Sequence, residues 1–200
     1  MNFKIFIKPL LCATLLLSSL SAWAFQANQL VSDARAQIGK TLLYDPSYSA
    51  LSYPMGDVPM IKGVCTDVVI RALRVQGIDL QQRIHQDMQK NFAAYPQKWG
   101  LKRPDKNIDH RRVPNIMTYF TRQGYQIKAD PAQTQHYRAG DIVAWDLGKG
   151  LTHIGVISDK VAPRSTTPLV IHNIGYGTQE NNILFQYKII GHYRVPASVH

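Results

Sequence analysis

Apolar residues recur at helical spacing near the start of the chain. Leu30, Ala34 and Ile38 fall on one face of an ideal helix, and Gly39 suits its end. We therefore expect a helix over residues 27–40.

Three further helices are expected between residues 65 and 124. The first begins at Cys65, carries an apolar stripe of valine, alanine and leucine, and stops at Gly77. The second follows Asp79, which suits an N-cap, and runs to about residue 92. The third starts near Pro114, a residue favoured in a first helical turn, and ends at residue 124.

The second half of the chain has the pattern of strands. Short runs rich in Val and Ile predict strands over residues 141–145, 152–157, 169–172 and 183–195. Gly148-Lys149-Gly150 is a tight turn, so the first two strands should form a hairpin. Helices followed by a meander of strands predict one α+β domain over residues 25–200.

A loop of about twenty residues separates the first two helices. Residues 44–63 are rich in Pro, Gly, Ser and Tyr and contain Tyr53-Pro54-Met55-Gly56. A loop of this length is uncommon inside a small domain and often carries function.

Residues 1–24 have the features of a secretory signal peptide. Lys4 and Lys8 supply positive charge, residues 10–20 are apolar but short for a membrane span, and Ala22-Trp23-Ala24 offers a cleavage site. An uncleaved anchor helix is the alternative. We expect a periplasmic or secreted protein with no stable membrane insertion after cleavage.

The charge balance predicts an anionic partner. The formal net charge is +10, and loss of Lys4 and Lys8 with the signal peptide leaves +8. Export argues against nucleic acid, and the chain has no basic and aromatic recognition motif. A cell-wall polymer or the membrane surface fits better.

Cys65 is the candidate nucleophile. The chain has two cysteines, and removal of the signal peptide takes Cys12 away, so Cys65 is left without an internal partner. It lies at a predicted helix start, where free amide groups and the helix dipole should lower the pKa of a thiol and could hold an oxyanion. A small buried thiol is the alternative.

Two histidines lie in predicted neighbouring strands. His153 could take the proton of the thiol, and His172 could orient the ring of His153. Satisfied core histidines are the alternative. A zinc site formed by His110, His153 and His172 is conceivable, but no HExxH or paired-cysteine spacing is present, so we expect neither a metal nor a cofactor.

Asp109-His110-Arg111-Arg112 is a dense polar cluster before a helix. Arg111 or Arg112 could bind a substrate carboxylate, with His110 beside them. The alternative is capping by Asp109 and structural salt bridges.

Other polar and aromatic residues have two possible roles as well. Asp67 could neutralise one of these arginines or tune Cys65, or it could be a favourable acid in a first helical turn. Asn173 could replace His172 as the orienting residue, or it could belong to a turn. Trp99 and Trp145 could line a groove, although core packing suits Trp145 better.

The order of these motifs resembles the NlpC/p60 cysteine peptidases of the bacterial cell wall. The matching segments are Tyr53-Pro54-Met55-Gly56, Gly63-Val64-Cys65, residues 152–157 and Val170-Ile171-His172. The resemblance implies a papain-like α+β fold and cleavage of peptide bonds in peptidoglycan. It implies that Cys65 is the nucleophile, His153 the base and His172 the orienting residue, with Tyr53 near the site.

Longer runs are similar to a family of exported bacterial proteins, DUF1287. They are residues 63–71, 107–115 and 170–175, and the resemblance covers nearly all of the chain after the signal peptide. The chain departs from the NlpC/p60 pattern in three places. Val64 replaces the usual aspartate before the cysteine, the loop between His153 and His172 is longer, and residues 107–115 have no counterpart.

These observations together predict a cell-wall cysteine amidase or endopeptidase that acts on peptidoglycan stem peptides. One alternative is a peptidoglycan-binding module without catalysis on the same fold. Another is an acyl transferase that uses the same cysteine, because both reactions share an acyl-enzyme.

Overall fold

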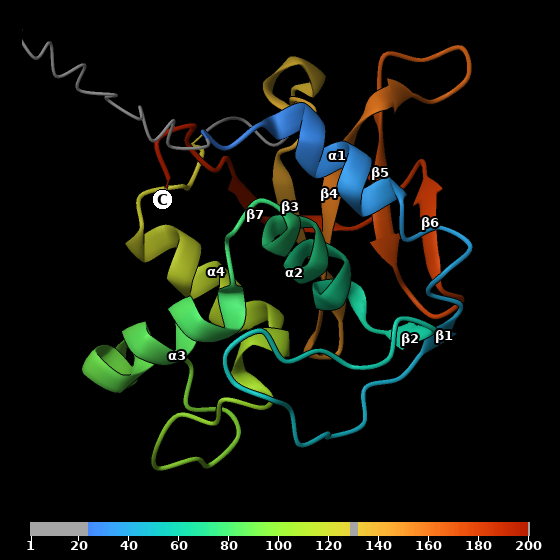
Figure 1. Ribbon diagram of the computed structural model, residues 1–200. Coiled ribbons are helices and arrows are strands. Elements are labelled where there is room, and N and C mark those ends of the chain that lie inside the picture. The colour runs from blue at the N-terminus through green and yellow to red at the C-terminus, as the bar shows by residue number, and fades with distance from the viewer. Residues whose placement is uncertain (1–23, 129–131, 200) are drawn as a thin grey trace, which may run out of the picture.

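A layer of helices covers one face of an antiparallel sheet in the computed structural model, which describes residues 24–128 and 132–199 (Figure 1). The helices are α1 (Ala27–Arg35), α2 (Cys65–Val75), α3 (Leu80–Asn91) and α4 (Val113–Arg122). Short 3-10 turns are η1 (Phe92–Ala94), η2 (Asp109–Arg111) and η3 (Thr134–His136). The mixed architecture confirms the predicted α+β class. The expected signal peptide lies outside the described residues except for Ala24.

Five strands form the main sheet, in the order β6-β5-β4-β3-β7. They are β3 (Ile142–Gly148), β4 (Leu151–Val161), β5 (Pro168–Asn173), β6 (Thr178–Asn181) and β7 (Lys188–Tyr193). All neighbouring pairs are antiparallel, and the predicted hairpin joins β3 to β4 with Trp145 opposite His153. His153 therefore lies in the central strand of the sheet, close to the start of β4.

Strand alternation divides the apolar side chains between two clusters. Ile154, Val156 and Ile171 pack in the cluster that includes α1 and α2, whereas Trp145 and Val170 belong to a second cluster on the other face. Helix α2 lies across β4 and β5, and α3 and α4 lie to one side (Figure 1). The start of α2 is thereby fixed against the sheet.

The long loop is pinned to the body of the molecule by a buried arginine. Its ends form β1 (Leu43–Tyr44) and β2 (Lys62–Gly63), which pair in parallel. Arg71 of α2 donates to the carboxylate of Asp57 at 2.8 and 3.1 Å and to the carbonyl oxygens of Val58 and Lys62. These bonds hold the chain that leads into Cys65.

Two predicted boundaries differ from the structure. The first helix ends at Arg35 because the chain then turns and the buried Gln37 side chain donates to the carbonyl of Val68 at 2.9 Å. The strand predicted over residues 183–195 is wrong in its first part, because Leu184 packs in the second cluster and accepts from the Trp145 indole at 2.8 Å. The polar edge strand β6 has no apolar alternation and escaped prediction.

Candidate active site

Asp67 determines where the cysteine helix begins. Its Oδ2 accepts the amide of Val64 at 2.6 Å, and Val64 itself has extended backbone angles. Cys65 and Thr66 are then the first helical residues, whose amide groups have no acceptor within the helix. Both amides act on the Cys65 thiol and favour its ionised form.

The effect of burial on the pKa of the thiol outweighs the effect of these amides. Cys65 is only 4% exposed, and burial raises the pKa of its thiol to about 12, against the opposing effect of the Ile154 amide and the helix amides. The expectation of a lowered pKa at the helix start is therefore wrong for the free protein. Cys65 is a neutral thiol at neutral pH.

His153 and His172 form a buried imidazole pair. Nε2 of His153 lies 3.0 Å from Nδ1 of His172, and the rings meet edge to face with centroids 5.0 Å apart. Burial lowers the pKa of His153 to about 3 and that of His172 to about 4. Both rings are thus neutral at neutral pH, and the pair is a hydrogen bond between neutral partners.

Gly155 makes room for this pair. It follows His153 on the same face of β4, and a Cβ at this position would lie 2.6 Å from Cγ1 of Val170 and 3.1 Å from Cβ of His172. A larger residue would push the His172 ring aside. The Gly in the Thr152–Ile157 run is therefore a packing requirement of the histidine pair.

The sulfur meets the backbone directly after His153. The amide of Ile154 acts on the Cys65 thiol and lowers its pKa, which places the sulfur against β4. Within residues 24–128 and 132–199, no hydrogen bond joins the sulfur to either ring, and Nδ1 of His153 has no partner. Nε2 of His172 is buried and unpartnered, and the His153 side chain is itself buried.

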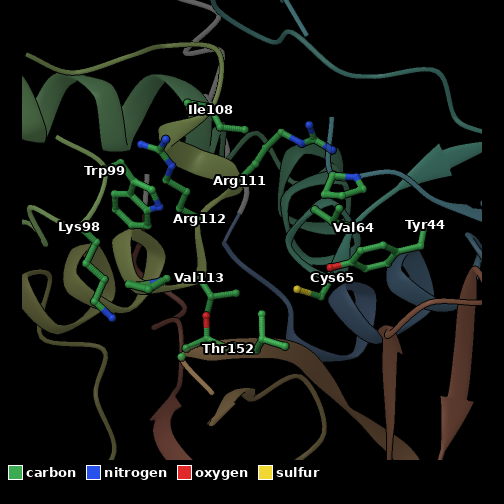
Figure 2. A pocket seen from close by; sticks show the side chains of 14 residues that line it. Tyr44, Val64, Cys65, Lys98, Trp99, Ile108, Arg111, Arg112, Val113 and Thr152 are labelled. Carbon is green, nitrogen blue, oxygen red and sulfur yellow. The ribbon is translucent and has the colours of Figure 1, made fainter. Parts of the chain in front are cut away.

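A cavity of about 370 Å³ opens at Cys65. Tyr44, Val64 and Cys65 line one end, and Lys98, Trp99 and Arg112 line the other (Figure 2). Thr152, directly before His153, lies between them, and the Tyr44 hydroxyl points toward Cys65 (Figure 2). Burial, with a contribution from Cys65, raises the pKa of Tyr44 to about 12, so its hydroxyl keeps its proton.

Tyr44, rather than the expected Tyr53, lines the cavity at Cys65. Tyr53 does not line this cavity. The centroid of its ring lies 5.2 Å from the centroid of the His85 ring and 5.7 Å from Nζ of Lys106. Tyr44 reaches the site because β1 pairs with β2, which puts Tyr44 opposite Gly63. The sequence contained no signal for this two-residue pairing.

Arg111 is fully engaged by the protein. Its guanidinium binds both Asp67 oxygens at 3.0 and 2.9 Å and donates to the carbonyl oxygens of Asp45 and Ser47. The Arg111 side chain is 2% exposed. Arg111 and Asp67 thus join the long loop, η2 and the start of α2. Arg111 therefore forms a structural salt bridge, the alternative role expected for this polar cluster.

Arg112 reaches the cavity in a fixed position. Its Nη1 donates to Oδ1 of Asp109 at 2.8 Å, and its guanidinium lies 4.1 Å over the Trp99 ring. Oδ2 of Asp109 accepts the amide of Asp105 at 2.6 Å, so the carboxylate is itself anchored. Trp99 lines the cavity, whereas Trp145 is fully buried in the sheet.

His110 and Asn173 lie beside the site without lining the cavity. His110 is 2% exposed, burial lowers its pKa to about 3, and its Nδ1 has no partner. Nδ2 of Asn173 donates to the carbonyl of Gly63 at 3.2 Å, and its Oδ1 accepts the amide of Gly175. Asn173 therefore joins the end of β5 to the strand before Cys65.

The described chain has neither a cluster of metal-binding side chains nor a membrane-spanning helix. No group of three or more His, Cys, Asp or Glu side chains there is arranged to hold a metal ion. None of its helices has the length and apolar character needed to cross a bilayer.

Comparisons with known proteins place the chain in a family. A family model described as a domain of unknown function, DUF1287, matches residues 31–195. The uncharacterized protein YijF of Escherichia coli strain K12 is 60% identical over 168 residues, which cover 84% of this chain and 81% of YijF. No solved structure matches the chain significantly. The extent of these matches shows that the chain belongs to the DUF1287 family.

Proposed function

We propose that this protein is an exported cysteine hydrolase that cleaves amide bonds in peptidoglycan stem peptides. One observation carries the proposal. His153 uses Nε2 to bind His172 and leaves Nδ1 free, and the thiol lies against the amide of the next residue. The ring pair supports a base and an orienting group, and the thiol supports a nucleophile; the contact between the sulfur and the His153 ring is what the proposal adds.

The hydrogen bond between the rings fixes which nitrogen can act as the base. If Nε2 of His153 carries its proton and donates to Nδ1 of His172, then Nδ1 of His153 has a free lone pair. His172 then carries its own proton on Nε2. Replacing His172 should therefore change the tautomer of His153 as well as its position.

Catalysis would begin from two neutral groups. The substrate carbonyl is attacked by Sγ of Cys65 as the thiol proton moves to Nδ1 of His153, forming a C–S bond and an imidazolium. Collapse of the tetrahedral intermediate breaks the C–N bond, and His153 gives its proton to the leaving amine. Water, deprotonated by His153, then attacks the thioester, and Cys65 regains its proton. No hydrogen bond joins Cys65 to the His153 ring in the described part of the free protein, so this contact must form when substrate binds.

Three groups are placed to bind the oxyanion. The amides of Cys65 and Thr66 have no acceptor within α2 and lie against the thiol, and the Tyr44 hydroxyl points toward the sulfur (Figure 2). Because the raised pKa of Tyr44 keeps its proton in place, it can donate to a developing negative charge.

The substrate class rests on the resemblance to NlpC/p60 peptidases and on the predicted export. We propose accordingly that the α+β arrangement is papain-like, with α2 as the nucleophile helix. Stem peptides carry carboxylates, and the positive charge of the chain suits such a substrate.

The test is digestion of purified sacculi. The protein should release fragments with new amine and carboxyl termini, identified by mass spectrometry, and the Cys65→Ala variant should release none. Fragments released equally by the Cys65→Ala variant, or none released by the wild-type protein, would refute the proposal.

The deep burial of the thiol favours a second function, binding to peptidoglycan without catalysis. This alternative expects retention on sacculi that Cys65→Ala does not change, and a thiol that resists electrophiles near neutral pH. The digestion assay separates the two functions, since a binding module retains sacculi without cutting them.

A further inference from the structure

The far end of the Cys65 cavity carries an excess of positive charge. Of the 14 residues that line the cavity, none is Asp or Glu, and Lys98, Arg111 and Arg112 are cationic. Arg111 is neutralised by Asp67, so its charge is not available to a ligand. Arg112 is likewise paired with Asp109, so Lys98 carries the unpaired charge of this end, and Arg112 contributes N–H donors that Asp109 does not engage.

Lys98 is free to bind. It is exposed, and in the described part of the chain its ammonium group has neither an ion-pair nor a hydrogen-bond partner. It also lines a second cavity of about 530 Å³, which shares Pro114 and Thr152 with the first and likewise has no acidic residue in its lining. The two cavities thus meet at Lys98.

Arg112 presents a rigid set of donors beside Lys98. Only Nη1 is engaged, by Asp109, and the stacking on Trp99 fixes the plane of the guanidinium. Nε and Nη2 have no partner among the described residues and are not sealed from solvent. Two free donors in one plane suit the two oxygens of a carboxylate.

We infer that Lys98 and Arg112 form a subsite for a free carboxylate of the substrate, in the groove that leads away from Cys65. This inference rests on the proposed function for the identity of the substrate as a stem peptide. It selects, among amide substrates, peptides that carry a free carboxylate near the scissile bond. The subsite orients the peptide, while Cys65 and His153 perform the chemistry.

Binding to an inactive variant tests the subsite apart from catalysis. The Cys65→Ala protein is titrated calorimetrically with a synthetic stem tetrapeptide and with the same peptide after its carboxylates are amidated. We expect the acid form to bind about tenfold more tightly, and added salt to reduce the difference. Lys98→Gln in the same background should remove most of it. Lys102→Gln is the matched control, because Lys102 is exposed on the same segment but does not line either cavity.

The outcomes separate the two proposals. Equal binding of the acid and amidated peptides, or equal effects of Lys98→Gln and Lys102→Gln, would overturn the subsite, even if the wild-type protein cleaves both peptides. A preference for the acid form that depends on Lys98 supports the subsite even if the wild-type protein cleaves neither peptide, in which case the hydrolase proposal fails.

Discussion

The sheet holds two buried histidine contacts that differ in the charge of the partner. Nε2 of His192 lies 2.7 Å from Oδ2 of Asp141, and Arg194 binds both oxygens of the same carboxylate. The His153 ring meets the neutral His172 and the Trp145 ring, and no acid takes part in these contacts. Burial without a carboxylate keeps the His153 ring neutral, whereas the Asp141 carboxylate is shared between a histidine and an arginine.

Replacing His153 and replacing His192 with glutamine should produce opposite results. His153→Gln should reduce the release of fragments from sacculi by about 10⁴-fold, because the base is lost. His192→Gln should leave turnover within a few-fold and lower the free energy of unfolding by about 1–3 kcal/mol, since a hydrogen bond to Asp141 is lost. Both quantities are measured on the same preparations, by fragment analysis and urea unfolding. Similar losses of turnover in the two variants would break the comparison.

The pH dependence of thiol alkylation should reveal the neutral state of the site. With the pKa of Cys65 raised to about 12 by burial, the thiolate fraction grows about tenfold per pH unit. The rate of carbamidomethylation by iodoacetamide should therefore rise about 10³-fold between pH 7 and pH 10. A plateau that begins below pH 7 would mean that His153 is charged and holds a thiolate, contrary to this account.

Acid should destabilise the protein through the neutral histidine pair. Because the folded-state pKa of His153 is lowered to about 3 while an unfolded histidine titrates near 6.5, the unfolded chain binds more protons as pH falls through this window. Each such histidine should cost about 2 kcal/mol of stability between pH 7 and pH 5.

Urea unfolding at the two pH values checks this contribution. The His153→Gln variant should lose about 2 kcal/mol less than the wild-type protein over the same interval, and His172→Gln should behave alike. An unchanged pH difference in both variants would show that these rings titrate normally.

Gly155→Ala tests the packing of the pair through its effect on stability. The new methyl group meets Val170 and His172, which should cost about 1–3 kcal/mol in urea unfolding. Combining it with Val170→Ala removes the closest contact, so the double variant should cost at least 0.5 kcal/mol less than the sum of the single variants. Strict additivity would locate the strain elsewhere.

The predicted elements were most accurate where apolar spacing was regular. Periodicity placed α2, α3 and α4 and the β3–β4 hairpin, and the two strand histidines singled out in the sequence form a buried pair in the structure. It could not find Tyr44, whose position depends on a pairing between two-residue strands 19 residues apart. The sequence pattern near Cys65 also could not show whether burial or the helix amides dominate the pKa of the thiol, because burial depends on the whole packed sheet.

The central claim is that Cys65 becomes acylated with the help of His153. The most direct measurement is the intact mass of the protein after acid quenching during incubation with stem peptides. We predict a mass increase equal to the acyl fragment, mapped to Cys65 by peptide analysis, at a much lower rate in His153→Gln and absent in Cys65→Ala. Cleaved peptides without any Cys65 adduct, or an adduct on another residue, would contradict the account.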